Sequence, residues 1–197
     1  MIVTVAAFKG GVAKTTTAVH LAAVCQDRGS TLLVDSDLNR SATAWRARGK
    51  GFPFELADSA AGASIAHRFK HVVIDTQARP NREDLKDLAD SCDLVIVPTA
   101  ADAMALDALM QTVELLDSLN RPYRILLTMV PPKPNKVGDE VQTMLRHEGW
   151  PVFKTYIRRL VAFQKAALLG CLVKDVSDPR APLGWSDYVA VGKEMLR

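Results

Sequence analysis

The sequence is poor in the features that mark secreted and membrane proteins. It has three cysteines among 197 residues, and no two of them form a C-x-x-C pair. This pattern favours reduced thiols in a cytosolic protein over a disulfide framework. No apolar run reaches the roughly 18 residues that span a bilayer, and the chain opens on a strand-like MIVTVAAF with no basic segment before it. We therefore expect no signal peptide and a cytoplasmic location.

The net charge of +3 conceals an uneven distribution along the chain. Residues 71–120 carry 3 Lys/Arg and 10 Asp/Glu, whereas residues 121–174 carry 10 Lys/Arg and 3 Asp/Glu. A basic stretch of this size can form a patch for an anionic polymer, or it can be an ordinary solvated surface.

Apolar runs and helix-like segments alternate along the chain. The runs are continuous in Val, Ile and Leu, which is typical of strands covered on both faces. They predict strands at 1–7, 31–35, 71–75, 93–98, 123–130 and 152–157. Helices are predicted at about 15–28, 82–91, 102–119, 136–148 and 160–169. This order predicts an α/β fold with a doubly wound, mostly parallel sheet and helices on both faces. With no linker in the sequence, we expect a single domain over residues 1–197.

The helix predicted at 102–119 carries an apolar stripe. Its members recur at roughly helical spacing: Met104, Leu106, Leu109, Met110, Val113, Leu116 and Leu119. We interpret the stripe as core packing and not as a ligand site.

The stretch 8-FKGGVAKTT-16 combines glycine, lysine and threonine between a predicted strand and a predicted helix. It fails the usual phosphate-loop pattern G-x-x-x-x-G-K-[ST], because Phe8 and Ala13 stand at the two glycine positions. Its own two glycines still let the backbone turn and expose N–H groups to phosphate oxygens at a helix N-terminus. Lys14 can reach the phosphates and the Thr15 hydroxyl can bind Mg²⁺. The predicted site for ATP and Mg²⁺ comprises Lys9, Gly10, Gly11, Val12, Ala13, Lys14, Thr15 and Thr16.

Acidic residues follow two further predicted strands, in 34-VDSD-37 and 72-VVIDT-76. Ligands of such sheets bind at the carboxyl ends of the strands. Asp35 or Asp37 could approach a magnesium ion or an attacking water, or could only cap the next helix. Asp75 suits the hydration shell of Mg²⁺. We therefore predict a magnesium site from Thr15, Asp37 and Asp75.

The motif K-G-G-x-x-K-T at Lys9 to Thr15 resembles the deviant Walker A loop of the ParA/MinD family of P-loop ATPases. VDSD and VVIDT resemble the family's second motif and its Walker B strand, and 92–102 and 156–173 resemble later stretches in the same order. The resemblance implies that Lys9 crosses to the phosphates bound by a second protomer. It also implies catalytic roles for Lys14 and for Asp37, which would help to orient the hydrolytic water.

Three departures from the family pattern affect this interpretation. Leu38 and Asn39 stand where Pro and Gln are usual, so the geometry after Asp37 is less determined. Gln77-Ala78-Arg79 replaces the usual turn, and Arg79 could sense nucleotide or simply be exposed. If the position of Ala13 requires a positive φ, alanine there carries a strain of about 1 kcal/mol.

The resemblance is strongest to small ParA-type partition ATPases without an N-terminal helix-turn-helix. It implies a homodimer that closes on ATP, binds nucleoid DNA non-specifically and hydrolyses ATP slowly until a separate centromere- or cargo-binding adaptor stimulates it. Such a protein would segregate plasmid or chromosomal DNA. Because the segment 183–197 has only Lys193 and Arg197 as basic residues, a membrane partner is not expected. The candidate DNA contacts are Lys154, Arg158, Arg159, Lys165 and Lys174, although Arg158 could instead serve the dimer.

Other functions stay open at this point. The same mechanism could position a protein cargo or an organelle on the nucleoid, and the sequence does not separate this from DNA segregation. A metabolic ligase of the dethiobiotin synthetase type would need a small-molecule pocket, for which no constellation is evident. An iron–sulfur relative would need two cluster cysteines per subunit at the dimer face, and the positions of Cys92 and Cys171 argue against it.

Overall fold

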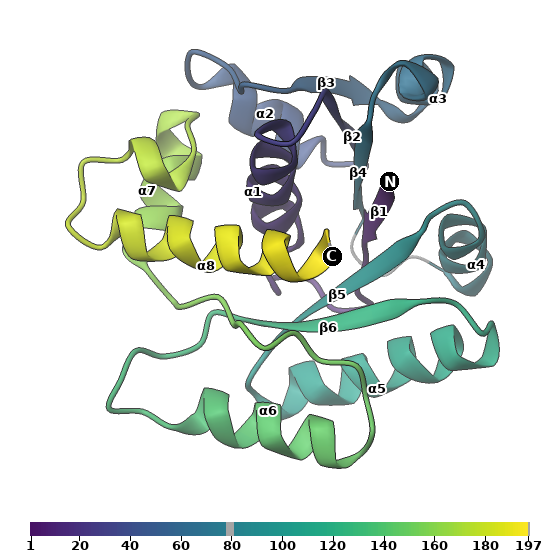
Figure 1. The fold of residues 1–197 in the computed structure, drawn as a ribbon, viewed down its shortest axis with the longest axis vertical. Coiled ribbons are helices and arrows are strands. Elements are labelled where there is room, and N and C mark those ends of the chain that lie inside the picture. Colours follow the sequence, from purple (N-terminus) through teal and green to yellow (C-terminus); the bar gives the residue numbers. More distant parts are fainter. Residues whose placement is uncertain (78–80, 197) are drawn as a thin grey trace.

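A six-stranded sheet with all neighbouring strands parallel forms the centre of the molecule (Figure 1). The computed structural model describes residues 1–77 and 81–196. The strands are β1 (Ile2–Val5), β2 (Thr31–Ser36), β3 (Glu55–Asp58), β4 (His71–Thr76), β5 (Leu94–Ala100) and β6 (Tyr123–Thr128). Their order across the sheet is β3-β2-β4-β1-β5-β6. Because β1 lies between β4 and β5, the chain winds outward in both directions, and the predicted doubly wound fold is confirmed.

Helices cover both faces of the sheet (Figure 1). One face carries α1 (Lys14–Gln26), α2 (Ser41–Ala47), α7 (Val161–Leu169) and α8 (Ala181–Met195). The other carries α3 (Ser59–Ile65), α4 (Arg82–Asp90), α5 (Ala103–Ser118) and α6 (Val137–His147). Short 3₁₀ turns lie at η1 (Ala66–Arg68) and η2 (Val173–Asp175). Within the described ranges, every helix is too short or too polar to cross a bilayer.

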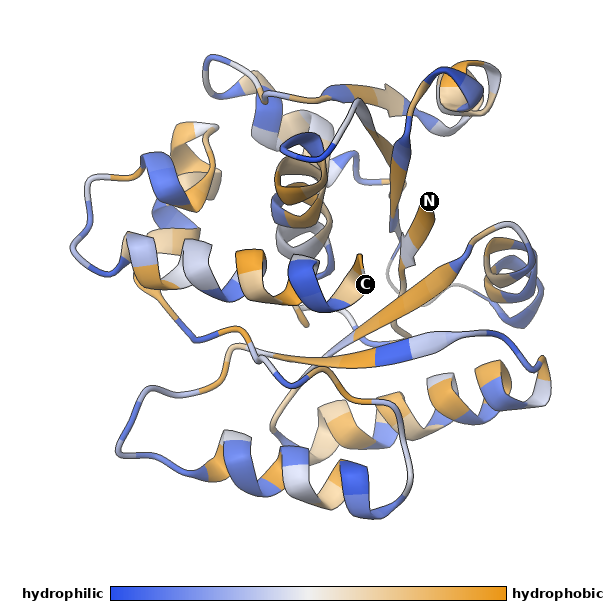
Figure 2. Ribbon diagram, in the orientation of Figure 1, coloured by the Kyte–Doolittle hydropathy of each residue, from blue (hydrophilic) through white to orange (hydrophobic). Residues whose placement is uncertain are grey.

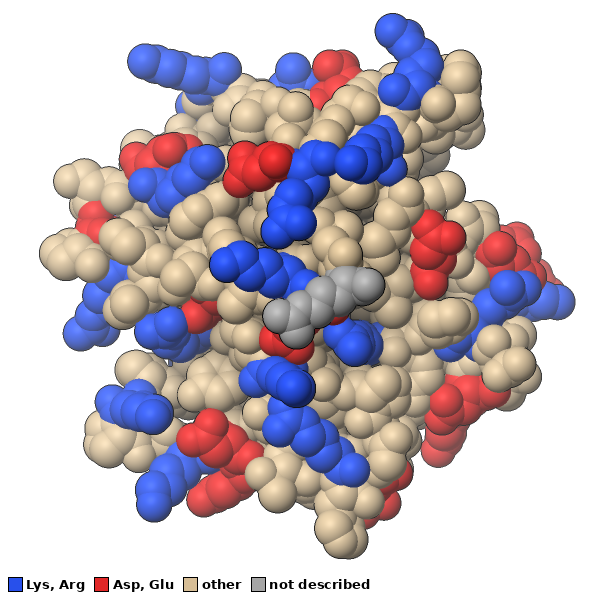
Figure 3. All heavy atoms as spheres, viewed as in Figure 1, with Lys and Arg blue, Asp and Glu red and all other residues tan. Residues whose placement is uncertain are grey.

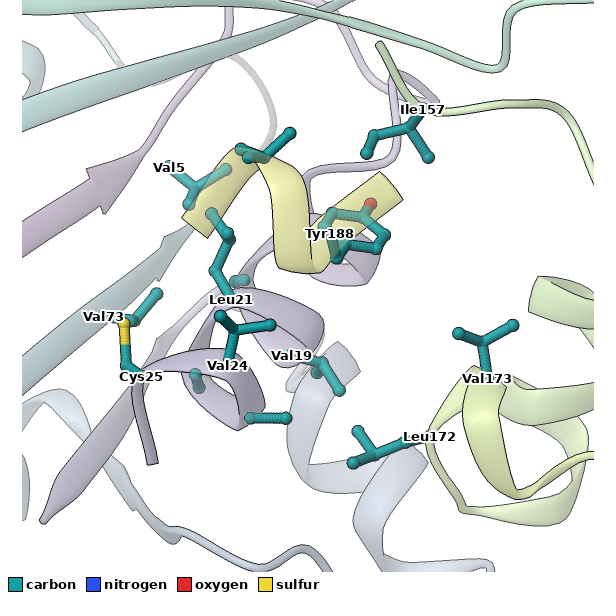
Figure 4. Close-up of a cluster of buried hydrophobic side chains, with 14 of the residues drawn as sticks. Val5, Val19, Leu21, Val24, Cys25, Val73, Ile157, Leu172, Val173 and Tyr188 are labelled. Carbon is teal, nitrogen blue, oxygen red and sulfur yellow. The ribbon is translucent and has the colours of Figure 1, made fainter. Parts of the chain in front are cut away.

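Successive strand residues enter opposite cores, as the pleat of a strand requires. Leu33 of β2 packs in the cluster under α1 and α8, whereas its neighbours Leu32 and Val34 pack in a separate cluster on the other face. Figure 4 shows the first cluster, where Leu21 and Val24 of α1 approach strand residues and Tyr188 of α8. In Figure 2 much of the sheet is hydrophobic, whereas the helices carry hydrophobic and hydrophilic residues in alternation. Each fully buried aliphatic side chain contributes about 1.5–3 kcal/mol.

The prediction of a strand at 152–157 is wrong. The segment runs beside β6 but forms only two isolated bridges, Ile125 with Val152 and Val130 with Arg158. Between them, Glu194 of α8 accepts hydrogen bonds from the backbone N–H groups of Lys154 and Thr155, at 2.8 and 3.0 Å. Because these N–H groups are bound to a carboxylate, they do not pair with β6, and the ladder is interrupted.

Three short elements were not predicted, and one stripe was partly misjudged. Strand β3 and helices α2 and α3 have few large apolar residues, so their sequences carry little periodicity.

In the apolar stripe of α5, Leu109, Val113 and Leu116 are buried as expected. Met104 and Met110 are 73% and 46% exposed, which contradicts a core role for these two side chains.

Candidate functional site

The phosphate loop lies between β1 and α1, at the carboxyl edge of the sheet. Gly11 has φ of +75°, and Ala13 takes a left-handed conformation with φ of 62° and ψ of 35° immediately before α1. The structure thus meets the condition under which alanine at position 13 is strained, by about 1 kcal/mol.

The N–H groups of residues 9–16 donate no hydrogen bond to any residue that the structure describes. They comprise the loop and the first turn of α1, where intrahelical acceptors are absent. A hydrogen bond from the end of β6 fixes the loop, because the Thr128 hydroxyl donates to the carbonyl of Val12 at 3.1 Å. A fixed loop with unpaired N–H groups at a helix N-terminus is an anion receptor.

Lys14 is buried beneath this loop. Its Nζ donates to the carbonyl oxygen of Lys9 at 3.2 Å, so the side chain folds back along the loop. Burial lowers its pKa, and the negative charges of Asp75 and Asp37 oppose that change. The ammonium therefore faces two strand-end carboxylates, at the place where phosphate oxygens would meet the loop.

Lys9 takes a different direction. Its Nζ lies 3.0 Å from Oδ1 of Asp102, the residue that precedes α5. The same Oδ1 accepts from the N–H of Ala105 at 2.9 Å, so Asp102 also caps α5. The Lys9 side chain is 27% exposed and that of Asp102 is 54% exposed, so this ion pair is accessible to water. The two lysines of the loop thus have distinct partners.

Asp35 and Asp37 separate into two roles. Asp35 is buried, and its Oδ2 accepts from both the N–H and the hydroxyl of Thr43, at 2.8 and 2.6 Å. Those bonds give Asp35 a structural role in attaching α2. Asp37 is partly exposed and accepts from Asn39 at 3.1 Å and from the Ser41 hydroxyl at 3.0 Å. Leu38 is 85% exposed, at one of the positions that departs from the family pattern.

Asp75, at the end of β4, is fully buried, and neither carboxylate oxygen has a hydrogen-bond partner in the described part of the chain. Burial raises its pKa to about 7, the charges of Asp35 and Asp37 add to the rise, and the nearby Thr15 hydroxyl and Lys14 ammonium oppose it. A buried carboxylate without a partner costs several kcal/mol unless it is protonated or meets a cation.

These residues fit a magnesium ion that takes most of its ligands from water and phosphate. Within residues 1–77 and 81–196, no group of three His, Cys, Asp or Glu side chains forms a metal cage. Mg²⁺ seldom uses such cages and usually binds through one or two protein oxygens plus substrate phosphates. The unpartnered carboxylate of Asp75 beside Thr15 matches this requirement.

A cavity of about 550 Å³, which the sequence did not indicate, lies beside β6. Its lining includes Pro131, Pro132, Tyr156, Arg158 and Asp187. Tyr188, next to Asp187, shares a hydrogen bond of 3.1 Å with Thr17 in the first turn of α1. Asp187, which lines the cavity, therefore precedes in α8 a residue that contacts the helix that begins at the phosphate loop. The proline-rich 131-PPKPN-135 after a strand was the signal that could have located it.

The predicted DNA contacts are only partly available. Arg158 donates from Nε to both carboxylate oxygens of Asp187, at 3.1 and 3.0 Å, and Asp187 is buried. Lys165 pairs with Asp178 at 2.8 Å, and Lys174 lies over the ring of Trp185. Lys154 and Arg159 are exposed and have no ion-pair partner among the described residues. The position of Arg79, a possible nucleotide sensor, lies outside the described residues.

His20 is a residue that the sequence analysis did not single out. Its Nδ1 lies 2.7 Å from the Thr16 carbonyl, and its Nε2 accepts from the N–H of Val173 at 3.0 Å. The ring stacks on Tyr188, with centroids 4.9 Å apart. His20 thereby links the first turn of α1, the helix that follows the phosphate loop, to η2. The two segments are far apart in the sequence and meet only in the folded chain.

Comparisons with known proteins agree with this geometry. The chain matches the family described as "CobQ/CobB/MinD/ParA nucleotide binding domain" over residues 3–173. The maintenance of carboxysome distribution protein A of Gloeobacter kilaueensis is 34% identical over 197 residues, covering 96% of this chain and 91% of that relative. A putative plasmid partition protein from Borrelia burgdorferi, bound to AMPPNP, matches with TM-score 0.74 and 17% identity, over 98% of each chain. MinD of Aquifex aeolicus matches with TM-score 0.77 and 13% identity, over 99% of this chain and 96% of that one. The protein therefore belongs to the CobQ/CobB/MinD/ParA family of nucleotide-binding proteins, as its deviant Walker A motif indicated.

Proposed function

We propose that this protein is a Mg²⁺-dependent ATPase that positions a protein assembly within the cell, by closing into an ATP-bound homodimer on nucleoid DNA. The observation that carries the proposal is the likeness over nearly the whole chain to a protein named for carboxysome distribution. The phosphate loop, with two lysines that have different partners, supports the same mechanism.

The described residues would supply the parts of phosphoryl transfer. The unpaired N–H groups of residues 9–16 and the Lys14 ammonium would bind the phosphates. Thr15 and Asp75 would hold Mg²⁺, which neutralises charge that develops on the phosphate oxygens. Asp37, at the mouth of the site, would orient the attacking water once its bonds to Asn39 and Ser41 rearrange. The cavity beside Pro131 and Asp187 would hold the base.

Lys9 would act across the dimer. In the single chain its ammonium pairs with Asp102, the residue before α5. Exchange of this ion pair for the phosphates of a second protomer would make ATP part of the interface. Hydrolysis removes that bond, so the dimer would act as a timer. A separate cargo-binding adaptor would set its rate.

A second candidate is segregation of plasmid or chromosomal DNA. It is favoured by the structural likeness to a plasmid partition protein, although that likeness, at 17% identity, shows the fold alone. The two candidates differ in cargo and share the site.

The dimer mechanism is tested by comparing Lys9→Ala with Lys14→Ala. Lys14→Ala should abolish ATP binding, measured by titration calorimetry. Lys9→Ala should retain ATP binding within about threefold but lose ATP-dependent dimerisation, measured by light scattering. Unchanged dimerisation and hydrolysis in Lys9→Ala would refute the role across the interface.

The cargo is tested by capture with protein locked in the ATP state. We expect Asp37→Ala to retain ATP without hydrolysing it, and the captured partner should then belong to a protein assembly. Recovery of a protein bound to a centromere-like DNA site would instead support segregation.

A further inference from the structure

Basic side chains gather at the amino edge of the sheet, opposite the phosphate loop. Arg124 lies near the start of β6, Arg146 and Lys193 lie in the last turns of α6 and α8, and Lys154 lies on the segment beside β6. We call these four residues the amino-edge patch. In Figure 3, Lys and Arg side chains are spread from the top of one face through its centre to its lower part, with Asp and Glu side chains among them.

Specific contacts bring the Arg124 and Arg146 side chains and the backbone of Lys154 together, and Lys193 precedes Glu194, which shares these contacts. The Arg124 guanidinium lies 5.2 Å from the ring centroid of Phe153 and donates to the carbonyl of Glu194 at 3.1 Å. Arg146 donates to the carbonyl of Phe153 at 3.2 Å. Lys154 follows Phe153, and its N–H binds the Glu194 carboxylate at 2.8 Å. Four separate elements thus meet around Phe153 and the end of α8.

The charge of the patch is not neutralised by ion pairs. Across the described residues, none of its four members lies within ion-pair distance of a carboxylate. The carboxylate in their midst, Glu194, accepts from the N–H of Lys154 and from the N–H and hydroxyl of Thr155. Arg158 and Lys165, in contrast, are paired with Asp187 and Asp178. The patch therefore keeps its positive charge for a ligand, as does exposed Arg159, which also lacks an ion-pair partner among the described residues.

A second basic group continues the patch past the end of α1. Lys70 donates to the carbonyl of Arg28 at 3.0 Å, and the ammonium group of Met1 donates to the carbonyl of Lys70 at 2.9 Å. Gly192 of α8 packs closely on Val24 of α1, where a Cβ would come within 2.4 Å of that side chain. This contact sets the end of α8 beside the end of α1, so the two basic groups are neighbours.

We propose that the amino-edge patch is the surface that binds the phosphate backbone of DNA, a proposal that rests on the nucleoid role in the proposed function. Exposed lysine and arginine without a carboxylate partner bind phosphates through charge and release of counterions, without reading bases. Most of the patch, namely Arg124, Arg146 and Lys193, lies at the opposite edge of the sheet from the phosphate loop, whereas Lys154 also lines the cavity beside β6. DNA can therefore reach the patch while a second protomer covers the phosphate loop.

The test compares two double variants that remove the same charge. Arg146→Ala with Lys193→Ala removes half of the patch, and Lys165→Ala with Lys174→Ala removes two of the contacts predicted from the sequence. Arg124 and Lys154 are retained, because Arg124 packs on Phe153 and Lys154 also lines the cavity beside β6. Binding to non-specific duplex DNA is measured by fluorescence anisotropy with a non-hydrolysable ATP analogue over a series of salt concentrations.

The patch variant should bind at least about tenfold more weakly at about 0.1 M salt, and its slope of log K against log salt should be about two units shallower. The control variant should stay within about twofold of wild type. Melting temperature should stay within about 4 °C of wild type in both variants, and ATP-dependent dimerisation should be unchanged, which separates a lost surface from a lost fold.

The remaining outcomes each decide a different point. If the control variant loses DNA binding while the patch variant keeps it, the proposal that the amino-edge patch binds DNA is overturned and the proposed function stands. If wild type binds no DNA with nucleotide at low salt, the nucleoid part of the proposed function fails and the patch fails with it. If wild type binds vesicles of phosphatidylglycerol and not DNA, and the patch variant loses that binding, the ligand is a lipid surface and the DNA proposal is overturned.

Discussion

Protonation of His20 should weaken the contact between α1, the helix that follows the phosphate loop, and η2. In the folded chain one ring nitrogen faces the carbonyl of Thr16 and the other faces the N–H of Val173. This arrangement requires a neutral ring with its proton on Nδ1. A protonated ring would turn a second N–H toward the N–H of Val173, so the two donors would oppose each other.

The magnitude follows from the pKa of His20. Burial lowers it from 6.5 to about 4, although the bond to Thr16 acts in the opposite direction. Because the folded-state pKa lies below the unfolded-state value, the unfolded chain takes up the proton first as the pH falls. The stability contributed by the neutral ring is therefore fully present above about pH 6.5 and is lost progressively toward pH 4. Linkage gives a loss of about 2 kcal/mol between pH 7 and pH 5 and about 3 kcal/mol in all.

The assay is chemical denaturation of wild type and of His20→Gln over about pH 4.5 to 7.5. Carboxylates also titrate toward the low end of this range, but they do so in both proteins, so the difference between the two free energies of unfolding isolates His20. That difference should fall by about 2 kcal/mol between pH 7 and pH 5. Parallel curves, within about 0.5 kcal/mol throughout, would refute the role given to the buried neutral ring.

Three further predictions concern the loop and the ion pairs. Ala13→Gly should raise the free energy of unfolding by about 1 kcal/mol, because glycine relieves the left-handed strain at φ of 62°; a destabilised variant in denaturation would contradict this. Asp102→Asn should keep the cap on α5 but release Lys9, and ATP-driven dimerisation should strengthen by at most about fivefold, since an exposed pair contributes about 0–1 kcal/mol; weaker dimerisation in light scattering would show that the pair assists closure. Arg158→Ala should cost about 2–4 kcal/mol because it leaves the buried Asp187 unpaired, whereas Lys165→Ala should cost less than about 1 kcal/mol at its more exposed pair. Equal losses in denaturation would contradict the difference in burial.

The sequence predicts those parts of the site that lie in continuous stretches. The loop from Lys9 to Thr16 contains its strand, its turn and the start of its helix, so local chemistry is enough to identify it. Asp75 is predictable for the same reason, because a run of apolar residues ends in one carboxylate. What the stretch does not reveal is the environment. The full burial of Asp75, and the absence of a hydrogen-bond partner for it in the described chain, depend on strands far away in the sequence.

Contacts between distant residues account for what the sequence missed. The bond from Val173 to His20 joins residues 153 positions apart, and the pair of Lys9 with Asp102 joins residues 93 apart. The predicted strand at 152–157 failed for a related reason, because the carboxylate that takes its N–H groups comes from Glu194. The hydrophobicity of residues 152–157 alone does not indicate that Glu194 competes with β6 for these N–H groups.

Charge shows the same limit in a form that bears on function. Summed along the chain, residues 121–174 present one basic region, and Arg158 and Lys165 count in it as fully as Lys154. In the fold, Arg158 pairs with Asp187 of α8, and Lys165 pairs with Asp178, which lies just before α8. Lys193, from a region with more acidic than basic residues, lies beside Glu194 at the same edge as Arg124. A binding surface for a polyanion is set by charges that stay unpaired in space, so a window of sequence can give the sign of the charge without showing which residues are paired.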